Sequence, residues 1–255
     1  MIFTDTHSHL YSTQFNADIE DVVAAAIEAG IKRVFLPNVN LESIELLKSL
    51  TAKYPDMMKP MMGLHPCEVK ENYKEVLDII YKEYCTGNYV AVGEIGIDLY
   101  WDKTTEAIQT DAFITQCKWA AANNHAVSIH CREAIALTIE LLQKEKIVGL
   151  KGVFHCFGGS LQQANEVIEM GFMLGIGGVV TYKNTDLRDT LKLIDLKHIV
   201  IETDAPYLAP VPYRGKRNDT VYLIETAKIL ANIYGVTLAE IAEATTTNSR
   251  EIFGC

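Results

Sequence analysis

Short runs of apolar, β-favouring residues alternate along this chain with longer stretches whose apolar residues recur at helical spacing. The eight short runs are Ile2–Thr6, Arg33–Pro37, Pro60–Leu64, Tyr89–Glu94, Ala126–His130, Gly152–His155, Phe172–Gly175 and Ile199–Glu202. The amphipathic stretches between them are Ile19–Ala29, Leu41–Lys53, Lys74–Tyr84, Thr105–Asn123, Ala134–Lys144 and Gln162–Met170. Each run begins roughly 20–40 residues after the previous one, which is about the length of one strand–helix unit.

This alternation predicts an α/β protein in which eight strands and the helices between them form a (β/α)8 barrel, or TIM barrel. A doubly wound open sheet is the alternative arrangement for the same pattern. No linker rich in Pro, Gly or Ser and no block of charge interrupts the chain, so residues 1–255 are expected to form a single domain.

The C-terminal segment is also predicted to be helical. Thr220–Tyr234 is followed by Gly235, a residue type that commonly ends a helix, and Thr237 with Glu240 has the spacing of a capping box that starts another. Asn248 begins a second stretch with the same spacing, which indicates one more helix start.

Acidic residues outnumber basic ones by 33 to 23, which gives a formal net charge of −10 at pH 7. Phosphate backbones bind basic surfaces, so this charge argues against coating of nucleic acid through bulk electrostatics, while a local basic patch stays compatible with it. The six cysteines form no CxxC pair, which indicates free thiols in a reducing cytoplasm. The opening sequence MIFTDTHSHL has no secretory signal, and no uncharged stretch reaches the roughly 20 residues of a membrane helix. We therefore expect a cytoplasmic protein without membrane contact.

Metal-binding residue types follow most of the apolar runs, at or just beyond their C-terminal ends. They are His7 and His9 in DTHSH, Glu94 in VGEIG, His130 in IHCR, His155 in FHCF and Asp204 in ETDAP. The C-terminal ends of barrel strands meet at one mouth, so these residues are predicted to form a single cluster. Any one of them alone has an ordinary explanation, such as a hydrogen-bonded core histidine or a rim salt bridge, but their recurrence favours metal ligation.

Four histidines and two carboxylates exceed the needs of one tetrahedral site and suit two adjacent divalent ions with open positions for water. Glu94, which stands between two glycines, is predicted to bridge the two ions. Asp204 is predicted to be both a ligand and the general base that takes a proton from water. Glu202 shares its face and is the rival for this role, and we assign it as a substrate contact. Mixed imidazole and carboxylate ligands suit Zn²⁺ or Mn²⁺, whereas phosphoryl chemistry often uses Mg²⁺.

Three further residues are predicted to contact the substrate on the mouth side. They are His65 in GLHP, Arg132 just past His130, and Arg217 in the basic stretch RGKR. Guanidinium groups match phosphate oxygens in pairs, so the two arginines are candidates for holding a phosphate. A solvated run of charge is the alternative explanation for RGKR.

Several longer motifs together identify a family resemblance that runs essentially from end to end. The motifs are DTHSHL, GLHP, VGEIGIDLYWD, IHCREA, FHCFGGS, IETDAPYLAP, RGKRND and TTTNSREIF. They resemble the TatD-type metal-dependent hydrolases and deoxyribonucleases of the amidohydrolase superfamily. The resemblance implies a dinuclear site with His7, His9, Glu94, His130, His155 and Asp204 as ligands, Glu94 as the bridge, and hydrolysis of phosphodiester bonds in DNA, often from an end.

Two details refine this resemblance. The family's usual RGKRNEP reads RGKRNDT here, so the loop on the substrate side departs from the pattern at two positions. No lysine occurs in Tyr89–Asp98, which disfavours the branch of the superfamily in which a modified lysine bridges the metals.

The leading hypothesis is therefore a divalent-metal phosphodiesterase that binds single-stranded or frayed DNA ends locally at the mouth. An alternative keeps the metals but changes the substrate to an ester or amide, such as a D-aminoacyl-tRNA. A metal-loaded scaffold without activity is disfavoured because all six ligand positions are present. The sequence does not set the oligomeric state, and a monomer is compatible with it.

Overall fold

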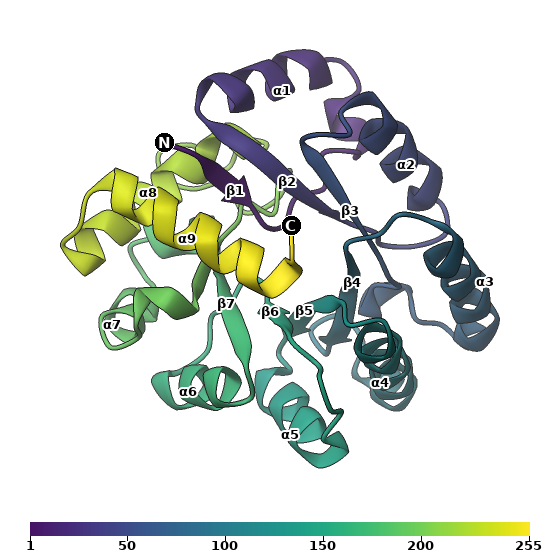
Figure 1. Ribbon diagram of the computed structural model, residues 1–255. Coiled ribbons are helices and arrows are strands. Elements are labelled where there is room, and N and C mark those ends of the chain that lie inside the picture. The colour runs from purple at the N-terminus through teal and green to yellow at the C-terminus, as the bar shows by residue number, and fades with distance from the viewer.

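Eight parallel strands form one sheet whose order follows the sequence from β1 to β8, in the computed structural model of residues 1–255 (Figure 1). The strands are β1 (Phe3–Asp5), β2 (Ile31–Pro37), β3 (Met58–Met62), β4 (Ala91–Asp98), β5 (Ala126–Arg132), β6 (Gly152–Phe154), β7 (Phe172–Ile176) and β8 (Ile199–Ile201). Every neighbouring pair runs parallel. The strands form a nearly closed barrel with helices between them, which confirms the predicted TIM barrel over the open sheet.

Nine α-helices accompany the strands. They are α1 (Ile19–Glu28), α2 (Ser43–Lys53), α3 (Tyr73–Thr86), α4 (Glu106–Ala122), α5 (Ile135–Glu145), α6 (Leu161–Glu169), α7 (Leu187–Leu191), α8 (Leu223–Tyr234) and α9 (Leu238–Phe253). Short 3-10 turns are η1 (Thr13–Phe15), η2 (Pro66–Glu68), η3 (Lys103–Thr105), η4 (Gly178–Thr181), η5 (Leu196–His198) and η6 (Thr220–Tyr222). The short helix α7 was not among the predicted helices, because its single turn and a half carries too few residues for a periodic pattern.

The seam between β1 and β8 is closed by hydrogen bonds just beyond the strands' C-terminal ends. The backbone N–H and the hydroxyl of Thr6 both donate to the carbonyl of Ile201, at 3.0 and 3.1 Å. The backbone N–H and hydroxyl of Thr203 donate to the carboxyl oxygens of Asp5, at 2.9 and 2.6 Å. The barrel is thus joined at the same end at which the candidate ligands lie.

A separate cluster of eight buried residues combines alternate positions of the strands with the end of α9. It consists of Phe35, Met61, Ala91, Ala126, Val153, Val200, Ile252 and Phe253. The last two belong to α9, which crosses one end of the barrel so that the C-terminus lies near its centre (Figure 1). The Phe35 and Phe253 rings lie 4.4 Å apart. Helix α9 therefore covers the N-terminal end of the barrel, and the mouth at the C-terminal end stays open.

Strands β4 and β5 continue four and two residues beyond their predicted ends, to Asp98 and Arg132. Asp98 lies opposite Arg132 in their register. The extension follows from side-chain alternation, because Ile95 and Ile97 are buried in the main core while Glu94 and Asp98, on either side of them, face His130 at the mouth. These two strands therefore build a taller wall on one side of the mouth.

The C-terminal segment confirms two of the predicted helix boundaries and contradicts a third. Helix α8 ends with Gly235 in the left-handed region, and Thr237 with Glu240 forms the capping box of α9. Asn248 does not start a helix, since α9 runs through it unbroken. Its side-chain amide instead donates to the carbonyls of Leu196 and Ile199, which anchors α9 beside β8. No single helix has the length and apolar composition to span a membrane, although the α8 and α9 segments, bent by 105°, meet these criteria as a pair.

Candidate metal centre

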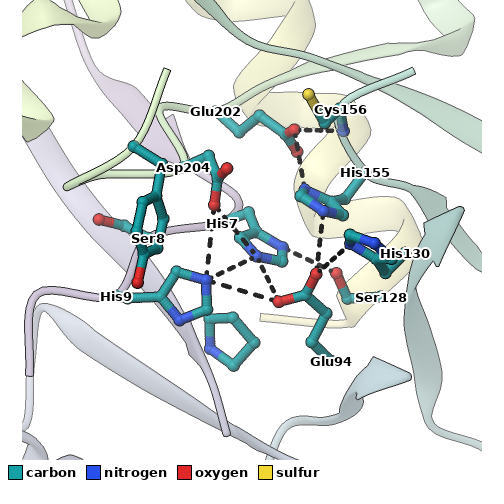
Figure 2. A network of polar contacts seen from close by, with 12 residues as sticks. His7, Ser8, His9, Glu94, Ser128, His130, His155, Cys156, Glu202 and Asp204 are labelled. Atoms are coloured by element: carbon teal, nitrogen blue, oxygen red, sulfur yellow. Dashed lines mark hydrogen bonds and ion pairs between the residues drawn. The ribbon is translucent and has the colours of Figure 1, made fainter. Parts of the chain in front are cut away.

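Glu94 lies at the centre of a group of histidines at the mouth of the barrel (Figure 2). Its Oε2 lies 3.2 Å from His7 Nε2 and 3.5 Å from His9 Nε2. Its Oε1 lies 2.9 Å from His130 Nδ1 and 3.0 Å from His155 Nε2. The two oxygens of one carboxylate therefore face two separate pairs of histidines.

Asp204 joins the first of these pairs. Its Oδ1 lies 3.5 Å from His9 Nε2 and 3.8 Å from His7 Nε2. The backbone N–H of Asp204 donates to the carbonyl of His7 at 2.9 Å, which fixes the two segments against each other. Asp204 has a φ of 57°, in the left-handed region that Asp and Asn enter more readily than other residues with a side chain. The structure thus brings together all six predicted ligand residues: His7, His9, Glu94, His130, His155 and Asp204.

His65, which the sequence predicted to contact the substrate, lies directly beside two of the candidate ligands. Its Nε2 is 3.4 Å from Glu94 Oε1, and its ring lies 4.6 Å from that of His130. The Nδ1 of His65 accepts the backbone N–H of Cys67, so the ring turns its Nε2 toward Glu94. His65, Glu94 and His130 form a third set of three side chains with metal-ligand spacing.

Each of the four candidate-ligand histidines has a polar partner on a further ring nitrogen. The pairs are His7 with Ser128 (3.0 Å), His9 with Tyr11 (2.8 Å), His130 with Asp98 (2.9 Å) and His155 with Glu202 (3.3 Å). Such partners fix the orientation of a metal-binding imidazole and raise its basicity. The rings are therefore held in place before any ion arrives.

Sequence reasoning missed three of these partners, Tyr11, Ser128 and Asp98. Asp98 stands four positions after Glu94 on β4, and Ser128 stands two positions before His130 on β5. Residues spaced by two along a strand share a face, so both share the interior face with a predicted ligand. Alternation through the whole of VGEIGID would have found Asp98, had the strand not been ended at Glu94.

Glu202 lies behind the centre and does not line the cavity in front of it. Its side chain is fully buried, and its Oε1 accepts hydrogen bonds from His155 Nδ1 and from the backbone N–H of Cys156. This placement differs from the predicted substrate contact, because Glu202, just past the end of β8, lies on the opposite side of His155 from Glu94 (Figure 2). Its Oε2 is buried without a hydrogen-bond partner.

The histidines determine the charge state of the central carboxylate. Burial by itself would raise the pKa of Glu94, but the charges of His65, His7 and His155 outweigh burial and hold that pKa well below its usual range. Burial lowers the pKa of His7, whereas the negative partners of His9 overcome burial and raise its pKa well above the ordinary value. An ionised carboxylate among crowded imidazoles is a donor set that fits divalent transition-metal ions or Mg²⁺ with open positions.

Comparison with known proteins identifies the family of this chain. The family model described as TatD related DNase matches residues 4–254. The metal-dependent hydrolase YabD of Bacillus subtilis is 34% identical over 254 residues, which cover 99% of each chain. The 3′-5′ ssDNA/RNA exonuclease TatD of Escherichia fergusonii is 32% identical, with 98% of each chain covered. The chain belongs to the TatD family.

A solved structure extends the match to three dimensions. The crystal structure of YJJV, a TatD homologue from Escherichia coli K12, has a TM-score of 0.92 at 28% identity, covering 99% of this chain and 98% of that one. This TatD protein is accordingly a metal-dependent hydrolase.

A cavity of about 620 Å³ opens in front of the centre of this TatD protein. This volume lies within the range of ordinary small-ligand sites. Two of the predicted substrate contacts, His65 and Arg132, line it, together with the exposed rings of Trp101 and Tyr207. The guanidinium of Arg132 forms no ion pair and lies 3.8 Å above the ring of Tyr100.

Arg217, the fourth predicted substrate contact, does not line this cavity. Its guanidinium donates to both carboxylate oxygens of Asp18, at 2.9 and 2.6 Å, and to the carbonyl of Gln14 at 2.7 Å. It also lies over the ring of Phe15, at 4.4 Å. These contacts tie the loop before η6 to the segment between η1 and α1, so a carboxylate of this chain takes the place predicted for a phosphate.

Proposed function

We propose that this TatD protein uses two divalent ions to hydrolyse phosphodiester bonds at single-stranded or frayed DNA ends, releasing nucleotides one after another. The position of Glu94 carries the proposal, because each of its oxygens faces a different pair of histidines. A bridging carboxylate between two ion sites requires that geometry. The relative named a 3′-5′ ssDNA/RNA exonuclease supports an exonucleolytic reaction.

The residues divide into two candidate ion sites. His7, His9 and Asp204 surround the Oε2 side of Glu94, and His130 with His155 surrounds the Oε1 side. Ions bound there would make water more acidic and neutralise charge on the phosphoryl oxygens. Zn²⁺, Mn²⁺ and Mg²⁺ are all compatible with these ligands.

Asp204 is the proposed general base. Its Oδ1 faces His7 and His9, which leaves Oδ2 free to accept the proton of the attacking water. Burial would raise the pKa of Asp204, but a hydrogen bond from His9 and the charges of His155 and His7 lower it, so the carboxylate is ionised at neutral pH. A carboxylate within hydrogen-bond reach of the attacking water is the geometry that base catalysis requires.

Arg132 is the proposed phosphate contact. It lines the cavity two positions beyond His130 on the same strand face, and its N–H groups have no carboxylate partner. An unpaired guanidinium can hold a phosphate through two parallel hydrogen bonds. It also supplies local positive charge in a chain whose net charge of −10 repels DNA.

The experiment is a cleavage assay with end-labelled single-stranded oligonucleotides and protein loaded in turn with Mg²⁺, Mn²⁺ or Zn²⁺. We expect stepwise release of nucleotides, loss of activity in excess chelator, and two ions per chain by elemental analysis. Parallel assays with labelled RNA and with D-aminoacyl-tRNA define the substrate. Faster turnover of the aminoacyl ester than of DNA would replace the nuclease proposal with the deacylase alternative, and activity in excess chelator would exclude metal-dependent hydrolysis altogether.

A further inference from the structure

Two adjacent aromatic residues and one arginine form an exposed corner on the rim of the cavity. We call Tyr100, Trp101 and Arg132 the aromatic corner. The rings of Tyr100 and Trp101 meet edge to face, with centroids 4.9 Å apart, and the guanidinium of Arg132 lies 3.8 Å from the first and 5.5 Å from the second. Arg132 and Trp101 both line the cavity in front of the metal centre.

Packing against the core does not explain the presence of a tryptophan at position 101. Its side chain is 70% exposed, although tryptophan usually buries most of its surface. It belongs to neither core cluster and to neither group of partly buried residues packed against them. The contrast with Trp119, which packs against the main core from α4, shows that only one of the two tryptophans serves the fold.

The loop that carries Trp101 is held in place from both sides. The backbone N–H of Tyr100 donates to Asp98 Oδ1 at 3.0 Å, and the other oxygen of Asp98 lies 2.9 Å from His130 Nε2. On the far side of Trp101, Asp102 accepts the backbone N–H of Thr104 and caps η3. The backbone on both sides of the exposed indole is therefore anchored, on one side through Asp98, which also contacts the candidate ligand His130.

We propose that Trp101 stacks on one base of the substrate, next to the phosphate that Arg132 holds. This inference rests on the proposed nuclease function and adds a binding position for a nucleobase. An indole face binds any of the bases, so the position favours unpaired ends without reading their sequence. Stacking also supplies affinity that does not depend on charge, which matters in a chain with a net charge of −10.

The test combines Trp101→Ala with the removal of single bases from the substrate. Metal-loaded protein is given a short single-stranded oligonucleotide, and the same oligonucleotide with an abasic residue at its last, second-last or third-last position. Base–aromatic stacking predicts that Trp101→Ala lowers kcat/KM on the complete oligonucleotide by about 5- to 150-fold. The loss should shrink sharply on one abasic substrate, because the variant and that substrate each remove the same contact. Trp101→Phe should restore most of the activity.

Two further variants serve as comparisons. Tyr81→Ala removes an exposed aromatic from the outer helix α3, away from the cavity, and should behave as the unaltered protein. Tyr207→Ala removes the exposed aromatic that lines the cavity beside His9. If the dependence on an abasic position follows Tyr207 and not Trp101, the proposal is wrong about which ring stacks. An equal loss on every substrate, or no loss, also overturns it.

A binding measurement keeps the inference separate from the nuclease proposal. The chain has two tryptophans, so Trp119→Phe leaves Trp101 as the only indole. In that variant a non-hydrolysable single-stranded oligonucleotide should quench the tryptophan fluorescence, and the matching abasic oligonucleotide should not. Failure to release nucleotides would overturn the nuclease proposal alone, while unchanged fluorescence at saturating oligonucleotide would overturn the stacking proposal alone.

Discussion

Arg132 and Arg217 were both predicted from the sequence to contact the substrate, but only Arg132 lacks a carboxylate partner in the structure. Arg132 stands at the end of β5 with its guanidinium over Tyr100 and without an ion pair. Arg217 stands in a basic stretch, and both oxygens of Asp18 occupy its guanidinium. An arginine is available to a substrate only where the fold has not already supplied a carboxylate, and that carboxylate can lie far away in the sequence. Five predictions test this contrast and the metal centre beside which Arg132 lies.

The largest effect is expected from Glu94→Gln. The change keeps the shape but removes the charge that both histidine pairs face, so we expect kcat to fall by about 1,000-fold or more. Elemental analysis should show loss of bound metal along with the activity. A variant that keeps both its metals and its activity would contradict the role of Glu94 as a bridge.

Glu202→Gln should have the next largest effect. It removes the buried charge that accepts from His155 Nδ1 without touching the cavity, and loss of such a partner typically costs about 10- to 100-fold in metal affinity or activity. The measurement is activity across a metal titration. A purely structural role for Glu202 would lower the melting temperature but leave the metal concentration needed for half activity unchanged.

Arg132→Ala should lower kcat/KM on oligonucleotides by about tenfold, the usual scale for one charge-assisted hydrogen bond. Arg132→Lys keeps the charge but not the paired donors or the flat face over Tyr100, so it should recover only part of the loss. Full activity of the lysine variant would show that charge alone matters at this position.

Arg217→Ala should have the smallest effect on catalysis, with kcat/KM within about threefold of the unaltered protein. Its expected cost is in stability, about 1 kcal/mol or less, because the pair with Asp18 is partly exposed. A tenfold loss of kcat/KM with normal stability would show that Arg217 contacts the substrate, as the sequence predicted.

The pair of Arg217 and Asp18 should also make the stability of the protein depend on pH. The hydrogen bond from Arg217 holds the pKa of Asp18 below its ordinary value of 3.8. The stabilisation is therefore complete above that value and is lost as the pH falls through the lowered pKa. The difference in melting temperature between the unaltered protein and Arg217→Ala should be larger at neutral pH than in strong acid, where only the contacts of Arg217 with Gln14 and Phe15 remain.

The sequence predicted the barrel and the six converging residues because both follow from periodicity. Strand–helix alternation fixes the fold class, and parallel strands bring their C-terminal ends together whatever lies between them. The prediction from the sequence ended β4 at Glu94 because a charged residue breaks an apolar run. It therefore missed Asp98 on the same face of the strand.

What the sequence could not predict is how partners pair over long distances. Glu202 and Asp204 differ by two positions, yet one lies behind His155 and the other reaches the cavity. The pairing of Arg217 with Asp18 spans 199 positions, and no local pattern identifies it. Both depend on the packed arrangement of segments and not on their spacing.

Ile252 and Phe253 pack with strand residues at the far end of the barrel, so that end offers no passage to the metal centre. The cavity in front of the centre is therefore reached from the mouth alone. If the proposed nuclease function holds, the oligonucleotide enters and the released nucleotide leaves through this one opening. Exit of the product then contributes to the rate of successive cuts.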